Sequence, residues 1–218
     1  MIPRTIHQIW IGPRPLPEVY RRYRQTWAEQ HPGWNFYYWD NRAVRELQVS
    51  RSGLLDQVRT ESERSDLLRY EILYRFGGVY VDADFECLRS ISKLAEPHTF
   101  FLACDKTPQY LNTGLLGVVP RHPFLAAVLA SLPGHLAQCQ SRDVTAANST
   151  TGTWFFGRLV KRCKPHLHVF PAHVFYPYLW DELHRRNEDF HVTSPDSYAV
   201  HHWGLSWRGT AAPVPVAG

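Results

Sequence analysis

The sequence predicts an α/β domain built on a mostly parallel central sheet that is flanked by helices. Short runs of β-branched and aromatic residues alternate with longer segments of helical periodicity, the order expected when helices connect parallel strands. The length agrees with this prediction. A chain of 218 residues can bury one well-covered core, because single cores grow to roughly 250 residues before they divide.

The predicted strands are short apolar runs bounded by Gly, Pro or polar residues. The first lies between Pro3 and Gly12 and carries Trp10 at its carboxyl end. Another runs directly into Asp82. Enrichment in Val, Ile, Tyr, Phe and Trp between such breakers is typical of strands. The predicted strands cover residues 5–11, 35–39, 79–81, 100–103, 115–119 and 167–170.

The predicted helices are defined by their start and stop signals. Asp40 is expected to cap a short helix, and Thr60-Glu-Ser-Glu63 has the form of a capping box. Gly77-Gly78 is expected to end the helix that follows this box. The predicted helices cover residues 17–30, 41–47, 61–76, 124–132 and 154–163.

The composition is that of an ordinary soluble protein with many aromatic residues. The apolar fraction is 44%, the net charge is +4, and no block of five like charges occurs, so nucleic-acid binding is not predicted. A weakly positive protein would suit a diphosphate ligand or an anionic membrane surface, and peripheral membrane contact fits this charge. The 8 Trp, 11 Tyr and 11 Phe offer flat faces for sugar rings and bases, although such residues also fill cores.

Cysteine usage and the chain ends lead to two further expectations. The four cysteines form no CxxC pair, so we expect reduced thiols. We find neither a signal peptide nor a run of about 18 apolar residues, so we expect a soluble, cytoplasmic protein unless the sequence comes from a longer anchored chain. Residues 1–209 are expected to form one domain, and residues 210–218 a flexible tail rich in Ala, Pro and Val.

Asp82 and Asp84 follow the apolar strand 79–81. Residues i and i+2 of an extended segment face the same way, so both carboxylates can converge on one ligand. Such a pair suits Mg²⁺ or Mn²⁺ shared with phosphate oxygens, or a ribose. Acidic residues separated by one position also occur in solvated turns, and that interpretation stays open for the isolated motif.

Two other polar groups are candidates for the same site. Asp66 and Arg69 share one helix face and could bind sugar hydroxyls or phosphate; they could equally form an intrahelical ion pair worth about 0.2 to 0.5 kcal/mol. His201 and His202 are adjacent, so they should point to opposite faces of a strand, and only one is expected to ligate a metal. Either histidine could instead be a packed core residue.

Four segments together resemble the DXD-containing glycosyltransferase family 32. This family includes yeast-type initiating α-1,6-mannosyltransferases and relatives of the catalytic domain of large clostridial glucosylating toxins. The resemblance spans nearly the whole chain, and it implies a GT-A fold with a Rossmann-like sheet, a UDP- or GDP-sugar donor, a Mn²⁺ or Mg²⁺ ion and transfer with retention of configuration. The segments are Ile6-His-Gln-Ile-Trp-Ile-Gly12, Ser65-Asp-Leu-Leu-Arg-Tyr70, Gly77-Gly-Val-Tyr-Val-Asp-Ala-Asp84 and His201-His-Trp-Gly-Leu-Ser-Trp207.

The resemblance also implies a role for each matching residue. Trp10 would stack on the donor base, while Asp66 and Arg69 would hold the donor sugar. Asp82 would contact the ribose and sugar, and Asp84 would bind the metal. The donor-binding set implied by the same motifs also includes Ile9, Tyr80 and Ala83.

The carboxyl-terminal motif is expected to close over the metal and the diphosphate. Its implied members are His202 as a metal ligand, with Ser206 and Trp207, although His201 stays open as the ligand. The resemblance further places Asn112 and Thr151 beside the sugar and acceptor. In this chain Thr153 replaces a proline that often follows the Thr-Gly pair.

The expected activity is transfer of a hexose from a nucleotide diphosphate sugar to a glycan, glycolipid or polysaccharide. The sequence names no obvious nucleophile, so attack from the face of the departing phosphate is favoured over a double displacement. Two alternatives are a non-catalytic nucleotide-sugar-binding protein on the same fold and a metal-dependent phosphohydrolase built on the two acids.

Overall fold

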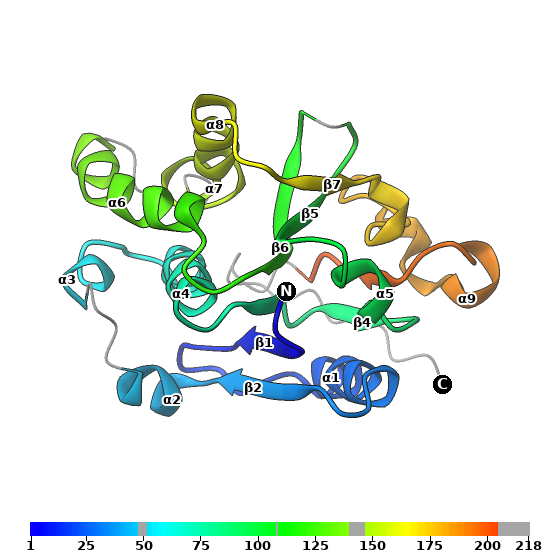
Figure 1. Ribbon diagram of the computed structural model, residues 1–218. Helices are drawn as coiled ribbons and strands as arrows, with labels where there is room; N and C mark the ends of the chain where they lie inside the picture. The colour runs from blue at the N-terminus through cyan, green and yellow to red at the C-terminus, as the bar shows by residue number, and fades with distance from the viewer. Residues whose placement is uncertain (48–51, 108, 140–146, 205–218) are drawn as a thin grey trace.

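A computed structural model describes residues 1–47, 52–107, 109–139 and 147–204 (Figure 1). Its centre is a six-stranded sheet with the order β2-β1-β3-β6-β5-β7. All pairings between these strands are parallel except the two made by β6, so the prediction of a mostly parallel sheet is confirmed. The strands are β1 (Thr5–Ile9), β2 (Asn35–Trp39), β3 (Gly78–Val81), β5 (Phe100–Cys104), β6 (Leu111–Val118) and β7 (His168–Phe170).

Each face of the sheet packs against its own apolar layer (Figure 1). One layer is formed by α4, α6 and α8 against side chains such as Tyr80 and Leu116. The other contains Trp27 of α1 and Phe85 against alternate strand positions such as Val79 and Val81. The helices are α1 (Glu18–Gln30), α2 (Asn41–Glu46), α3 (Ser52–Leu55), α4 (Glu61–Phe76), α5 (Ser92–Ala95), α6 (Pro123–Gln138), α7 (Ala147–Thr150), α8 (Thr153–Cys163), α9 (Phe190–Thr193) and the 3₁₀ turns η2 (Ala172–Val174) and η3 (Leu183–Asn187).

Several element boundaries differ from the prediction. Strand β1 ends at Ile9, so Trp10 lies just beyond it, and β6 begins at Leu111 instead of residue 115. Helix α6 continues through Pro133 to Gln138, because Leu136 is fully buried in the core. A second sheet, not predicted, pairs β4 (Phe85–Cys87) antiparallel with β8 (Ala199–His201). Strands of three residues are too short to carry a periodic signal.

The predicted helix caps are present. The carboxylate of Asp40 accepts the backbone N–H groups of Arg42 and Ala43 at 2.9 and 2.8 Å. The hydroxyl of Thr60 accepts the N–H of Glu63 at 3.1 Å. The reciprocal half of the capping box differs, because the Glu63 carboxylate accepts the N–H of Arg59 instead of that of Thr60.

The structure tests the expectation for the cysteines but not the expected tail. All four cysteines are free, in agreement with reduced thiols. None of the helices in the described ranges has the length and apolar character needed to cross a membrane. The proposed tail, residues 210–218, lies outside the described residues, so the division at residue 209 stays a prediction.

The turn between α4 and β3 positions the acidic motif and depends on His7. Gly77 and Gly78 have φ angles of 64° and 94°, and a Cβ on Gly78 would lie 2.7 Å from the Thr5 carbonyl oxygen. The Nε2 of His7 donates to the Gly77 carbonyl at 3.0 Å, and its Nδ1 accepts the indole N–H of Trp39 at 3.2 Å. Since an indole N–H can only donate, this arrangement requires a neutral imidazole.

The folded protein should therefore lose stability in mild acid through His7. Burial lowers the pKa of His7 to about 4, below its ordinary 6.5. The unfolded chain therefore binds a proton more readily than the folded protein does. The stabilisation that depends on neutral His7 is complete above pH 6.5 and is lost as the pH falls toward 4. Near pH 5 the free energy of unfolding is lower by about 2 kcal/mol. Urea unfolding across this range should show a smaller pH dependence for His7→Gln than for the wild type.

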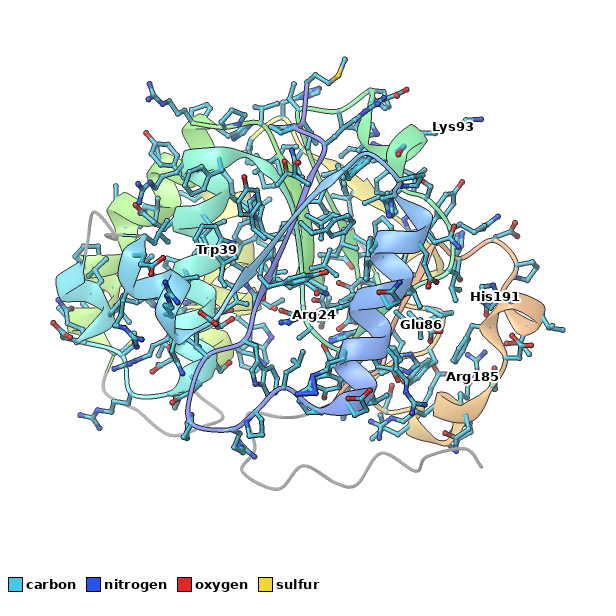
Figure 2. All side chains as sticks on the ribbon, turned by 90° about the horizontal axis from the view of Figure 1, so that it is seen from below. Arg24, Trp39, Glu86, Lys93, Arg185 and His191 are labelled. Atoms are coloured by element: carbon cyan, nitrogen blue, oxygen red, sulfur yellow. The ribbon has the colours of Figure 1, made fainter. Side chains whose placement is uncertain are left out.

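The matched control is His191→Gln, because His191 lies on α9 at the periphery of the molecule (Figure 2). It should leave the wild-type pH profile of unfolding unchanged. Equal pH dependence in the wild type and in His7→Gln would contradict the assigned role.

Candidate functional site

A cavity of about 980 Å³ opens at one edge of the central sheet. The carboxyl ends of β1, β3 and β5 meet there, and the reversed direction of β6 brings its first residues to the same edge. The lining therefore combines Trp10, Asp82, Asp105 and Asn112 from four strand ends with Asp66 from α4. Carboxyl ends of parallel strands are the usual ligand-binding edge of such sheets.

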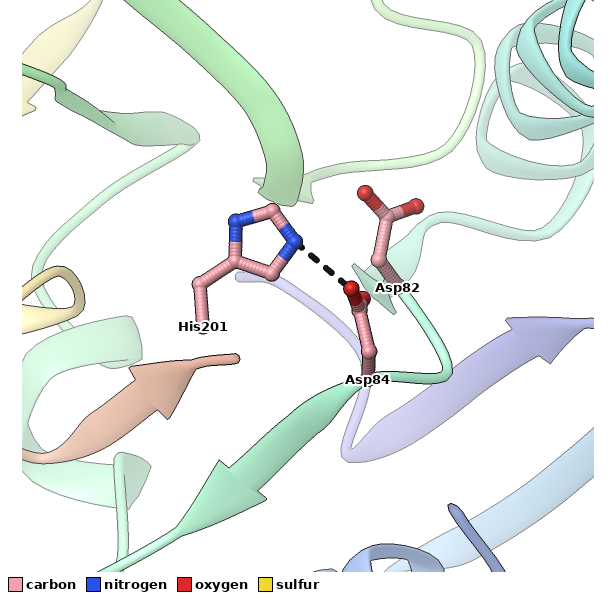
Figure 3. Close-up of side chains that lie close together, drawn as sticks. All are labelled: Asp82, Asp84 and His201. Carbon is pink, nitrogen blue, oxygen red and sulfur yellow. Dashed lines mark hydrogen bonds and ion pairs between the residues drawn. The ribbon is translucent and has the colours of Figure 1, made fainter. Parts of the chain in front are cut away.

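The acidic motif forms a tight turn between β3 and β4. The N–H of Phe85 donates to the Asp82 carbonyl at 3.1 Å. His201 Nε2 lies 3.1 Å from Asp84 Oδ1, and the N–H of Gly204 donates to Asp84 Oδ2 at 2.7 Å. Figure 3 shows the His201 ring directed at Asp84 with Asp82 beside them, and one ligand atom from each of these residues lies within 4.8 Å of the others.

Arg69 connects α4, β3 and β6 behind this turn. Its guanidinium donates to the carbonyl and hydroxyl of Thr113 at 2.7 and 3.0 Å, and to Asp82 Oδ1 at 3.0 Å. The hydroxyl of Tyr80 donates to the same Asp82 oxygen at 2.6 Å. Arg69 also lies 3.4 Å from Asp66 in an ion pair that is buried, not solvated. Asp66 and Asp82 thus share one cation.

The three acids have different pKa values because their surroundings differ. Burial raises the pKa of Asp66 to about 6, although Arg69 opposes that shift. Burial likewise raises the pKa of Asp82 against the effect of Arg69. Burial also opposes ionisation of Asp84, but His201 and the hydrogen bonds to its carboxylate outweigh it and hold the pKa at about 2. Asp84 is therefore a full carboxylate at neutral pH.

The structure places His201, not the predicted His202, beside Asp84, and which histidine ligates a metal stays a prediction. His202 Nε2 faces the Glu86 carboxylate at 2.9 Å. Its ring stacks on Tyr23 of α1, with ring centroids 4.4 Å apart and planes 7° apart. Figure 2 shows Glu86 close to α1. The two histidines point in opposite directions, as expected at a strand end, and only the register of β8 on β4 decides which one meets Asp84.

The segment after β8 is docked closely against the acidic motif. The N–H of His202 donates to the Asp84 carbonyl at 3.0 Å, and Trp203 adopts a φ of 50°. A Cβ on Gly204 would collide with the hydroxyl of Tyr20. Glycine at this position therefore allows the Gly204 N–H to reach Asp84.

The other predicted residues divide into three groups. Trp10, Ile9, Ala83 and Asn112 line the cavity with Tyr80. Thr151 does not; it is fully buried, and its hydroxyl donates to Asp66 Oδ2 at 2.8 Å, so it supports a lining residue instead. Ser206 and Trp207 lie outside the described residues.

Several lining residues were not predicted, and irregular structure explains most of them. Thr113 and Gly114 belong to the part of β6 that the strand prediction omitted. No periodicity marks the other three: Asp105 follows β5, Trp180 lies in the loop between η2 and η3, and Leu183 begins η3. The exposed fraction of Trp180, 56%, becomes informative only once the cavity is known.

Comparison with known proteins identifies similar glycosyltransferases. Residues 17–101 match the model described as "glycosyltransferase sugar-binding region containing DXD motif". The chain is 26% identical to inositol phosphoceramide mannosyltransferase 3 of Schizosaccharomyces pombe over 94% of this chain and 60% of that protein. It is 32% identical to mannosyl phosphorylinositol ceramide synthase CSH1 of Saccharomyces cerevisiae over 75% of this chain and 44% of that protein. Over residues 17–101 the chain is similar to the DXD glycosyltransferases.

The fold agrees with this similarity. The PaToxG glycosyltransferase superimposes with a TM-score of 0.57 at 17% identity, over 74% of this chain and 69% of that one, which supports the GT-A fold. The chain spans three fifths of the length of the first relative and less than half of the second.

Removing the shared cation should destabilise the protein markedly. Arg69→Met keeps an apolar stem but leaves the buried carboxylates of Asp66 and Asp82 without their partner, and breaking buried pairs costs about 3 to 5 kcal/mol. The cost should shrink in acid, because Asp66 then protonates. Urea unfolding at neutral and acidic pH measures both effects.

The control is Arg42→Met, which breaks an exposed ion pair with Glu46 on α2. Exposed pairs contribute about 0 to 1 kcal/mol, so this variant should unfold nearly like the wild type. Similar losses for both variants would contradict a special role for Arg69.

Proposed function

We propose that this protein is a metal-dependent retaining glycosyltransferase that moves a hexose from a UDP- or GDP-sugar to a glycan or glycolipid. The observation that carries the proposal is the convergence of Asp82, Asp84 and His201 in a large cavity at the ligand-binding edge of the sheet. The match of residues 17–101 to the DXD glycosyltransferase model supports it. The first relatives carry names of inositol phosphoceramide mannosyltransferases, which favours a glycolipid headgroup as acceptor.

The donor atoms at this site fit a divalent cation. Two ligand atoms at right angles around an ion about 2.1 Å away would be about 3 Å apart. Asp84 Oδ1 and His201 Nε2 are 3.1 Å apart. Carboxylate oxygens with one imidazole suit Mn²⁺ or Mg²⁺. Asp84 and His201 would hold the ion directly, with the Asp82 carboxylate close beside them.

The residues of the chain would divide the work of donor binding and transfer. A divalent ion bound here supplies a Lewis acid that stabilises negative charge on the departing diphosphate. Asp82, held by Arg69 and Tyr80, accepts hydrogen bonds from ribose or sugar hydroxyls with its other oxygen. Trp10 lines the cavity at the end of β1 and offers its indole to the nucleotide base, a contact worth about 1 to 3 kcal/mol.

Retention is best explained by attack on the face that the diphosphate leaves. The acceptor oxygen bonds to the anomeric carbon while the bond from that carbon to the phosphate oxygen breaks, and the hydroxyl proton passes to the phosphate. A double displacement needs a free carboxylate nucleophile. Among the acids that line the cavity, Asp66 and Asp82 are both paired with Arg69, which makes either a poor nucleophile.

Release of nucleotide from a defined donor panel tests the function. Purified protein with Mn²⁺ should release UDP or GDP from one of UDP-glucose, UDP-galactose, UDP-N-acetylglucosamine and GDP-mannose, and EDTA should abolish the release until Mn²⁺ is restored. Asp84→Asn is the inactive control. Tight donor binding without any release would identify a non-catalytic binder, and full activity in EDTA would rule out the metal mechanism.

A matched pair of histidine variants tests the ligand assignment. His201→Gln removes the imidazole beside Asp84, so Mn²⁺ affinity measured by calorimetry should fall roughly tenfold or more. His202→Gln keeps an amide that can still donate to Glu86, so its Mn²⁺ affinity should stay near that of the wild type. The reverse order would return the ligand to His202.

A further inference from the structure

The strand order arranges the cavity lining in a line along the sheet edge. Trp10 follows β1, Asp82 follows β3, Asn112 begins β6 and Asp105 follows β5. The next strand, β7, leads through η2 into the loop that carries Trp180. Because neighbouring strands lie about 4.8 Å apart, groups at successive strand ends form successive positions along the cavity.

The proposed function uses only part of this line. The nucleotide is assigned to Trp10 at the β1 end, and the sugar and diphosphate to Asp82, Asp84 and the start of β6. Asp105 and Trp180 also line the cavity, at the β5 and β7 end, and the proposed function assigns them no part in donor binding. An acceptor must reach the anomeric carbon from the side that the nucleotide leaves open, which is this end.

Trp180 has the features of a platform for a ring-shaped ligand. Its side chain is 56% exposed although it borders the cavity. The ammonium of Lys106 lies 5.7 Å from the centre of its ring and pairs with Asp181, which joins the end of β5 to the Trp180 loop. A flat indole bordered by fixed charges can stack on the apolar face of a ring while the charges bind its hydroxyls.

We propose that Trp180 and Asp105, with the pair Lys106 and Asp181 at their border, form the acceptor subsite and take a polyhydroxylated ring, either a hexose or a cyclitol. This inference rests on the proposed function and adds the acceptor's chemistry to it. The half-buried carboxylate of Asp105 faces the same cavity as Asp82 and accepts hydrogen bonds from ring hydroxyls. The same ring chemistry occurs in free saccharides and in glycolipid headgroups.

Steady-state kinetics of Trp180 variants test the subsite. The soluble acceptors are methyl α-mannoside, lactose and myo-inositol 1-phosphate, and vesicles containing phosphatidylinositol provide the lipid-bound ring. For whichever acceptor the wild type uses, Trp180→Ala should raise the acceptor KM roughly 2- to 10-fold without raising the donor KM. Trp180→Phe, which keeps an aromatic ring, should recover part of the loss.

Tyr110→Ala is the control. Tyr110 is an exposed aromatic residue on the β5–β6 turn, which also carries Asp105, but it does not line the cavity. Its acceptor KM should match that of the wild type. Circular dichroism melting of every variant excludes loss of folding as the cause of a change. An unchanged acceptor KM in folded Trp180→Ala, or an equal rise in donor and acceptor KM, would overturn the subsite.

Direct binding separates this inference from the proposed function. Saturation-transfer NMR with UDP or GDP and diamagnetic Mg²⁺ present should detect at least one of the three soluble probes on the wild type, and the apparent Kd of that probe should rise roughly 2- to 10-fold in Trp180→Ala. If no donor is turned over, the proposed function fails while ring binding can still be measured. If donors are turned over but no probe binds or accepts, the subsite is wrong and the proposed function stands.

Discussion

The buried guanidinium of Arg69 is the interaction on which the candidate site depends. A charge removed from water costs several kcal/mol unless it is paired and its donors are satisfied. Arg69 is paired with Asp66 and Asp82 and donates to Thr113, so its two terminal nitrogens are satisfied by α4, β3 and β6, while its buried Nε has no hydrogen-bond partner among the described residues. No other arrangement of these three elements would keep all of its contacts, so the cation fixes the helix relative to the two central strands. The edge of the sheet at which the cavity opens is fixed by the same contacts.

The contacts of Arg69 give the two motif acids, Asp82 and Asp84, different hydrogen-bond partners. Asp82 is tied to Arg69 and Tyr80 and holds one oxygen toward the protein. Asp84, two residues later, has no such partner and instead meets His201 and Gly204, which lie 117 and 120 positions away in sequence. The site is thus completed only when β8 pairs with β4, so its assembly requires contacts from nearly the whole length of the described chain. Glu86 and Tyr23 secure that pairing by holding His202 on the side away from the cavity.

The sequence predicted most of the fold because its signals were local. Asp40 and Thr60 act as caps through atoms within three residues, and the apolar runs of the central sheet are strongly β-forming. The choice between His201 and His202 was not local. Adjacent side chains on a strand exchange faces with a shift of one residue, so the answer depends on the register between β4 and β8. Trp180 was missed for a related reason, since nothing in an irregular loop indicates which cavity it will border.

The reversed strand β6 shapes the cavity to which the proposed function assigns two substrates. In an all-parallel sheet the edge beside β3 would present another carboxyl end, usually followed by a helix. Here β6 begins at that edge with Asn112, Thr113 and Gly114, and its backbone accepts the Asp82 N–H through the Gly114 carbonyl at 2.8 Å. The start of β6 therefore occupies the middle of the cavity edge as an extended segment, and the cavity continues on both sides of it. The nucleotide and the acceptor ring can then occupy opposite ends of the cavity, with the two acids between them.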